Sequence, residues 1–483
     1  MLFNIGSLLR NRPTGRFICF KSLAYRFWWA CTAFLFASGV NPDYFSVGDF
    51  YDHKRWVQLL WLYFTCGASL LQFFGEPSNV IFFSLSKLKQ RAVCALFLLA
   101  IFSVILGGGG ATSFRECLLW AALFTSGLFV ASAVVADRRG FSFFCVCILA
   151  VLTLYIFKYV VALGAAIYLQ QPVKASYLIS GVLNINFAAQ FLIFLVPLCW
   201  FFILHKNLNA IKFLMLMNLF FLWLLIFIAG YRGLGISILV MLVCTLALIR
   251  RKLLFFKINL AVFLLAVLVY ILLLDVVASN EFNSGFSELV SSTRRLELWV
   301  ESYKMFISHF WFGVGPNQFP YVLAEKDFSH PHNIYLQLLA ELGFPFAVIS
   351  GCLFYTFFSK GCRSALSKKG GDSVLRAVLT AAVVGVCTLG GVSGEFVMPI
   401  AQMGVVLSMG MFGAILVYRV DGVLKTSGTG LVARRVYGCF LVFLLLAFTS
   451  TIYKTSFGQY ECVYNPGPRF WSYGGVTRCA SDL

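Results

Sequence analysis

The sequence predicts an all-α fold: a polytopic transmembrane helical bundle of about 12 or 13 spans with one large external loop that contains short helices. Hydrophobic residues make up 60% of the 483-residue chain and charged residues only 12%, whereas a soluble domain carries about 25% charged residues. Apolar runs of roughly 16 to 25 residues recur along the chain, and each is long enough to cross about 30 Å of hydrocarbon. A protein with most of its length inside a membrane is therefore expected.

The apolar runs define about thirteen predicted spans. The run at 141–169 is long and contains Lys158, so it is either one tilted helix or a span followed by an interfacial turn. In chain order the predicted spans cover 24–40, 56–75, 92–108, 117–136, 141–169, 186–204, 213–230, 235–249, 258–277, 334–358, 377–396, 399–418 and 438–453.

Basic residues mark alternate connections between these spans. Clusters at 87–91, 250–257 and 360–376 all fall on the side of the membrane that holds the N-terminus. Because Lys and Arg collect in cytoplasmic loops, that side is predicted to be the cytoplasm. The net charge of +19 is then mostly a topology signal, and nucleic-acid binding is not expected.

This orientation divides the chain into four parts. They are an N-terminal bundle of about nine spans at 1–277, an external loop at 278–333, further spans at 334–453 and an external tail at 454–483. In an oxidising compartment the tail residues Cys462 and Cys479 could pair, and the sequence leaves open whether they do. No Cys/His spacing matches a zinc site, so no metal is expected.

The external loop is too long to serve only as a connection. From Arg295 its apolar residues fall near helical spacing, which predicts an amphipathic helix that either lies on the membrane surface or caps the spans. Gly313, Gly315 and Pro316 are predicted to end that helix. Asp327 and the helix glutamates Glu297 and Glu301 are isolated in the sequence, so we expect them to be solvated.

Three arginines on the outer side are candidate anion ligands. Arg294 and Arg295 begin the loop helix, and Arg232 lies at the outer end of a span, followed by Gly233. Taken singly, each is more simply a solvated residue or an interface anchor. Together they offer planar, permanently charged groups that match phosphate oxygens.

His332 is the candidate catalytic base. It lies just before an apolar helix, and an imidazole titrates near working pH. An isolated external histidine is more often inert, and the arginines on the same face are what favour a function here. Its neighbour Asn333 could either position a hydroxyl group or cap the helix.

The residues just named resemble the O-antigen ligase and O-antigen polymerase family of bacterial membrane glycosyltransferases. The family has an Arg-Leu-x-Leu-Trp-like start, here at 295–299, and a Gly-x-Gly-x-x-x-Phe turn, here at 313–319. It then has a His followed by Asn, Ser or Gln, with a Gly ten residues later, here His332-Asn333 and Gly343. The resemblance covers residues 184–358 well.

Two positions depart from the family pattern. The family often has Ser-Arg-Gly at an outer span end, whereas this chain has Tyr231-Arg232-Gly233. Three residues after Gly343 the ligase pattern expects Gly, Thr or Tyr, whereas this chain has Phe346. The second departure weakens the likeness to ligases, although a single large outer loop is more typical of ligases than of polymerases.

The resemblance implies an inverting glycosyltransferase that needs no metal or cofactor. It would move a glycan from undecaprenyl diphosphate to lipid A–core, as an O-antigen ligase does. Arg232, Arg295 and Arg294 would bind the diphosphate, His332 would be the catalytic base, and Asn333 would orient the acceptor or cap the helix. The enzyme would lie in the bacterial inner membrane, with residues 278–333 as a periplasmic catalytic loop.

Other functions remain open at this point. An O-antigen or exopolysaccharide polymerase uses the same kind of donor but extends another lipid-linked repeat, and protein O-oligosaccharyltransferases share the pattern. A polysaccharide transporter or flippase is a remoter alternative. Transporters usually place ionisable residues at mid-span, whereas the spans here are nearly free of charge.

Overall fold

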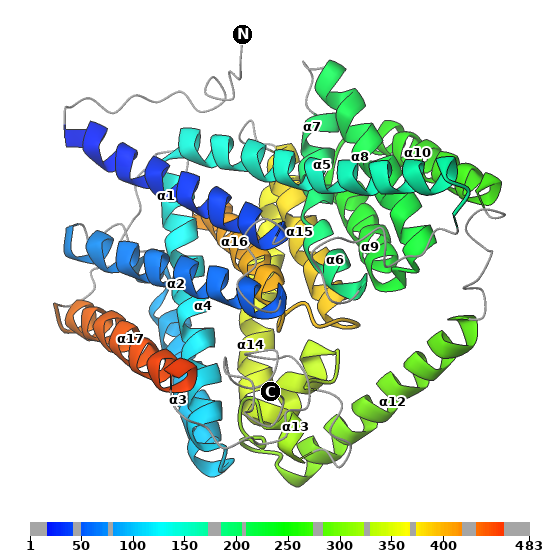
Figure 1. Cartoon of the computed structure of the whole chain (residues 1–483). Helices are drawn as coiled ribbons and strands as arrows, with labels where there is room; N and C mark the ends of the chain where they lie inside the picture. The colour runs from blue at the N-terminus through cyan, green and yellow to red at the C-terminus, as the bar shows by residue number, and fades with distance from the viewer. Residues whose placement is uncertain are drawn as a thin grey trace. The chain divides into compact units, whose positions relative to one another are not determined.

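The computed structural model describes residues 17–41, 50–75, 81–171, 185–204, 209–273, 284–322, 329–367, 373–417 and 431–457. Regular structure in these ranges is helical throughout, and none of them contains a strand (Figure 1). Ten of the described helices are long and apolar enough to cross a membrane. The prediction of an all-α, multi-span protein is confirmed.

Every predicted span overlaps a helix or a pair of helices. The first half of the chain forms α1 (Phe17–Val40), α2 (Phe50–Gly75), the 3-10 helix η4 (Ile81–Ser84), α3 (Lys87–Leu106), α4 (Gly110–Ala136), α5 (Arg138–Tyr168), α6 (Ile185–Leu192), α7 (Leu195–Leu204) and α8 (Asn209–Ala229). The second half forms α9 (Arg232–Leu248), α10 (Lys252–Leu272), α12 (Ser284–Ser308), α13 (Phe319–Val322), α14 (Ile334–Leu366), α15 (Ser373–Gly390), α16 (Pro399–Val417) and α17 (Leu431–Phe457).

Two predicted spans differ from the helices that form. The run at 186–204 is broken between α6 and α7, because Pro197 has no N–H to bond the carbonyl of Ile193. The run at 377–396 ends early, since α15 stops at Gly390 and a chain of turns occupies the residues that follow. Glycine lowers helix stability by about 1 kcal/mol, and several glycines fall in this stretch.

Contacts between helices divide the chain into two compact units. The first unit comprises Met1–Ser46, Ala136–Thr293 and Lys360–Glu395. The second comprises Val47–Val135, Arg294–Ser359 and Phe396–Leu483. The four parts predicted from the sequence are defined by membrane side, which this division does not test, and they stay a prediction.

Aromatic and polar contacts hold the first unit together. Trp29 of α1 packs on Phe144 of α5, with ring centroids 4.8 Å apart. Trp200 of α7 donates a hydrogen bond from Nε1 to Oδ1 of Asn259 in α10, at 2.8 Å. Helices α9 and α15 pack closely enough that a Cβ on Gly385 would fall 2.1 Å from the sulfur of Met241.

A buried polar network joins α2 to the start of α16 in the second unit. Arg55 is 1% exposed, and its guanidinium donates to Oε1 of Gln402 at 3.0 Å and to the carbonyl of Val397 at 3.2 Å. Tyr51 and Gln58 of α2 accept further bonds from it. A buried arginine is tolerated only when its donors are satisfied, so this network fixes the two helices against each other.

Candidate active site

Helix α12 carries the predicted arginine pair. The helix spans Ser284–Ser308, which confirms the predicted amphipathic helix and its end before Gly313. Leu298 and Met305 are buried on one face, whereas Arg294 is exposed and Arg295 is partly buried. Burial lowers the pKa of Arg295, but a guanidinium stays charged at neutral pH because its ordinary pKa exceeds about 12.

His332 lies in a strained turn just before α14. Its φ is +53°, a left-handed conformation that is uncommon for residues with a side chain and often marks a functional position. Burial, and secondly the charge of Arg295, lower the pKa of His332 to about 4. The structure therefore brings His332 and Arg295 together, and the imidazole is neutral at pH 7, as a proton acceptor must be.

Neighbouring groups hold the turn that carries His332. Trp299 of α12 donates from Nε1 to the carbonyl of Pro331 at 3.0 Å. The ring of His330 lies beside that of His332, with centroids 4.2 Å apart. Ser329 Oγ is 2.9 Å from Nδ1 of His330. Trp299 thus links the 295–299 stretch to the turn that carries His332.

Asn333 caps helix α14. Its Oδ1 accepts hydrogen bonds from the backbone N–H groups of Tyr335 at 3.0 Å and Leu336 at 3.1 Å. These are the second and third residues of the helix, whose N–H groups have no partner within it. Of the two roles predicted for Asn333, the structure confirms helix capping. Its contact with the acceptor stays a proposal.

Helix α14 is broken where the glycine turn meets it. Gly343 has φ +79° and ψ 175°, which is not helical, and Pro345 has no N–H to bond the carbonyl of Glu341. That carbonyl accepts instead from Gly315 N at 3.1 Å and from Ser103 Oγ at 2.7 Å. The carbonyl of Ala340 accepts from Val314 N at 2.9 Å. The break thus creates the seat on which the 313–319 turn binds.

Two family glycines are required at this seat because backbone approaches backbone. A Cβ on Gly313 would fall 2.3 Å from the carbonyl carbon of Glu341. A Cβ on Gly343 would fall 2.4 Å from the carbonyl oxygen of Trp311. Both glycines also adopt positive φ, so any larger residue would be strained as well as crowded.

The run of four glycines between α3 and α4 forms the other side of the seat. Ser113, in the first turn of α4, contacts the 313–319 turn: its Oγ donates to the carbonyl of Pro316 at 2.6 Å. Gln318 Nε2 lies 3.0 Å from Ser113 Oγ and 3.1 Å from Thr112 Oγ1. Sequence reasoning missed Ser113 and Gln318; Gln318 lies within the quoted motif, and Ser113 lies three residues after the last of the four glycines.

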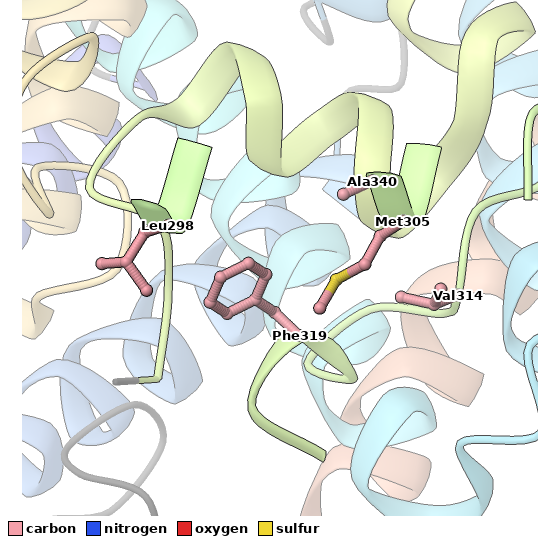
Figure 2. Close-up of a cluster of buried hydrophobic side chains, with 5 residues drawn as sticks. All are labelled: Leu298, Met305, Val314, Phe319 and Ala340. Carbon is pink, nitrogen blue, oxygen red and sulfur yellow. The ribbon is translucent and has the colours of Figure 1, made fainter. Parts of the chain in front are cut away.

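A small apolar core lies beneath these polar contacts. Figure 2 shows the side chains drawn from α12, the glycine turn, α13 and α14, which gather between those segments. They are Leu298, Met305, Val314, Phe319 and Ala340. The core ties the helix of the arginine pair to the helix that follows His332.

Arg232 lies in the first unit, at the start of α9. Gly230 adopts φ +70° and forms the short turn from α8, which leaves Arg232 exposed and the preceding Tyr231 1% exposed. Gly233 contacts the loop after α15: a Cβ there would meet a methyl group of Val392 at 3.1 Å. The predicted role of Arg232 in diphosphate binding stays a proposal.

The remaining sequence candidates have ordinary surroundings or lie outside the described residues. Glu301 forms an exposed ion pair with Lys304 at 2.7 Å, and Glu297 is exposed. Across the described ranges, no group of three or more His, Cys, Asp or Glu side chains could hold a metal ion. Asp327, Cys462 and Cys479 lie outside the described residues.

Comparison with known families gives one match on this region. Residues 216–351 match the family model described as O-antigen ligase. The matched stretch contains Arg232, α12, the 313–319 turn, His332 and Gly343. A comparison with curated proteins finds no match.

Proposed function

We propose that this protein, which carries an O-antigen ligase family domain over residues 216–351, is a membrane glycosyltransferase acting on a lipid-linked glycan. The observation that carries the proposal lies in the second unit. A neutral histidine, His332, is held in a strained turn. It lies close enough to Arg295 for the positive charge of that residue to lower the His332 pKa. A base beside a fixed cation suits transfer from a phosphate-linked donor.

The proposed donor is a glycan on undecaprenyl diphosphate. Arg295, with Arg294, binds the diphosphate and stabilises the negative charge that grows as the glycosidic C–O bond breaks. We propose the same role for Arg232, which lies within the matched residues 216–351. These guanidinium groups supply the positive charge, so the proposed transfer needs no metal.

His332 accepts the proton of the acceptor hydroxyl group as that oxygen attacks the anomeric carbon. The bond from the anomeric carbon to the diphosphate oxygen breaks in the same step, which inverts the configuration and releases undecaprenyl diphosphate. The pKa of about 4 keeps His332 unprotonated at neutral pH, where it can act without first losing a proton.

An apolar cavity in the second unit supports a lipid-borne substrate. It has a volume of about 140 Å³ and is lined by α3, α4, Pro316 and the broken part of α14. Its walls include Phe97, Trp120, Phe124 and Phe346. It lies directly against the 313–319 turn, so a hydrocarbon chain there would end beside the backbone that supports the site.

The proposed acceptor is lipid A–core, which makes the protein a ligase of the inner membrane with its site on the periplasmic face. The long segment from α10 to α14, which contains α12 and α13, supports this choice. The alternative is an O-antigen or exopolysaccharide polymerase, which is favoured by Phe346 at a position where ligases carry Gly, Thr or Tyr.

Deletion of the gene tests the two assignments. When surface polysaccharide is separated on a gel, loss of a ligase leaves bare core and glycan stranded on the carrier lipid. Loss of a polymerase leaves single repeats attached to core. An unchanged pattern would contradict both.

A further inference from the structure

Four buried side chains of the first unit each have at least one polar atom without a hydrogen-bond partner among the described residues. The atoms are the hydroxyl groups of Tyr159 and Tyr231, Oε1 of Gln190, and both carboxyl oxygens of Glu395. Each side chain is 2% exposed or less. Folded proteins leave few such groups, because each costs about 1–3 kcal/mol when unpaired, so a cluster of them requires an explanation.

These side chains belong to one region. Gln190 of α6 donates from Nε2 to Ser393 Oγ at 2.9 Å, and Ser393 lies two residues before Glu395 in the loop after α15. The same loop touches Gly233, two residues after Tyr231. Tyr231 in turn lies close enough to Tyr159 of α5 for the two phenols to interact electrostatically.

The region, which we call the tyrosine patch, comprises Tyr159, Gln190, Tyr231, Ser393 and Glu395. The phenol, amide and hydroxyl groups of the patch carry no charge at neutral pH, and burial favours the uncharged form of Glu395. Burial raises the pKa of the Tyr231 phenol well above its ordinary value, and it raises the pKa of Glu395 well above the ordinary range of carboxyl groups. The patch therefore offers neutral donors and acceptors beside aromatic rings.

Neutral hydrogen-bonding groups select for a particular ligand chemistry. A phosphate or carboxylate would require a cationic group inside the patch, and a metal ion would require ionised ligands. A sugar instead presents several hydroxyl groups that both donate and accept, and its apolar face packs on aromatic rings. The groups of the patch fit a sugar better than either ion.

We propose that the tyrosine patch binds the hydroxyl groups of one sugar residue of a substrate. The proposal rests on the glycosyltransferase function proposed above and specifies where a sugar is recognised. Tyr231 immediately precedes Arg232, the residue assigned to the diphosphate, so the first sugar of the donor is the expected ligand. A sugar of the acceptor has the same chemistry, and the two sources are separated experimentally.

The test uses the purified full-length protein in detergent and three probes. They are undecaprenyl diphosphate, undecaprenyl diphosphate bearing a single N-acetylglucosamine, and rough lipopolysaccharide that ends in core sugar. The variants are Tyr231→Phe, Tyr159→Phe and Glu395→Gln. Tyr437→Phe is the matched control, since that tyrosine packs among aromatic rings of the second unit, with its ring 5.6 Å from that of Phe82.

Each patch variant is expected to weaken binding of a sugar-bearing probe by about five- to tenfold, the loss of one hydrogen bond. Binding of undecaprenyl diphosphate without sugar stays unchanged. A loss confined to the N-acetylglucosamine probe identifies the donor sugar, and a loss confined to rough lipopolysaccharide identifies the acceptor sugar. The Tyr→Phe variants keep or raise the melting temperature, because they remove an unpaired hydroxyl from the interior.

Two results overturn the proposal, and they are distinguishable from failure of the proposed function. If the wild-type protein binds the sugar-bearing probes and the patch variants bind them equally well, the patch has no such role while the glycosyltransferase function stands. If the tyrosine variants lower the melting temperature and weaken all three probes alike, the hydroxyl groups are structural. A wild-type protein that binds none of the probes contradicts the patch and the proposed function together.

Discussion

Replacement of Gly343 by alanine tests whether the break in α14 is required. The backbone there has φ +79° and ψ 175°, a region open essentially only to glycine, and a side chain in it costs about 1–3 kcal/mol. The new Cβ would lie 2.4 Å from the carbonyl oxygen of Trp311. Relief of that clash would lengthen the 2.8 Å hydrogen bond from Phe344 N to the carbonyl of Phe310, which adds about 1 kcal/mol.

The expected total is a loss of about 2–4 kcal/mol in the free energy of unfolding. Gly351→Ala is the matched control, because it lies in the same helix with nothing within 4 Å of the new Cβ. It should stabilise by about 0.5–1 kcal/mol, as alanine does in a helix interior. Denaturant unfolding of both purified variants in detergent measures the difference. A Gly343→Ala protein that unfolds no earlier than the control would refute the account of the seat.

The remaining predictions concern the turn around His332. Because folding lowers the pKa of His332 from about 6.5 to about 4, the unfolded state binds more protons below pH 6.5. Stability should therefore fall by about 3 kcal/mol between pH 6.5 and pH 4, and His332→Gln should flatten that part of the melting profile. Arg295→Gln removes a neighbouring positive charge, so the fall in stability at acid pH should be smaller and should end at higher pH in the melting profile of that variant. Asn333→Ala should destabilise the protein by about 1 kcal/mol, because it removes the cap of α14. Asn333→Asp should keep the cap and the stability. Full activity of Asn333→Asp would argue against a contact between Asn333 and the acceptor. Trp299→Phe loses the hydrogen bond to the Pro331 carbonyl, and turnover should fall more than the melting temperature does; equal activity would show that the bond is dispensable.

Local patterns in the sequence predicted the helices and the surroundings of the loop. Helical spacing from Arg295 predicted α12, and the asparagine before an apolar run predicted the cap on α14. Both depend on residues within a few positions of each other, where spacing and capping chemistry decide the outcome.

The seat of the glycine turn could not be predicted in this way. It pairs Ser113 with Pro316 and Ser103 with Glu341, residues more than two hundred positions apart in the chain. Periodicity carries no information about which distant segments meet. The kink at Gly343 was equally hidden, because the apolar run continues through it and gives the pattern of a single span.

The tyrosine patch was hidden for a different reason. Tyr159 and Gln190 lie inside runs that are apolar enough to count as spans, and one polar atom in such a run does not change its prediction. Glu395 lies near the end of a run predicted to be helical, whereas α15 ends at Gly390. Only the packing of α5, α6 and the loop after α15 reveals that their polar atoms are buried without partners.

Transfer by the His332→Ala variant is the most direct test of the proposed mechanism. The assay supplies the purified protein with a lipid-linked glycan and an acceptor, and the cell assay measures surface polysaccharide. The account predicts that transfer is lost while the variant still inserts and binds the donor, and that Arg295→Ala and Arg232→Ala lose transfer together with donor binding. Normal surface polysaccharide in all three variants would contradict it.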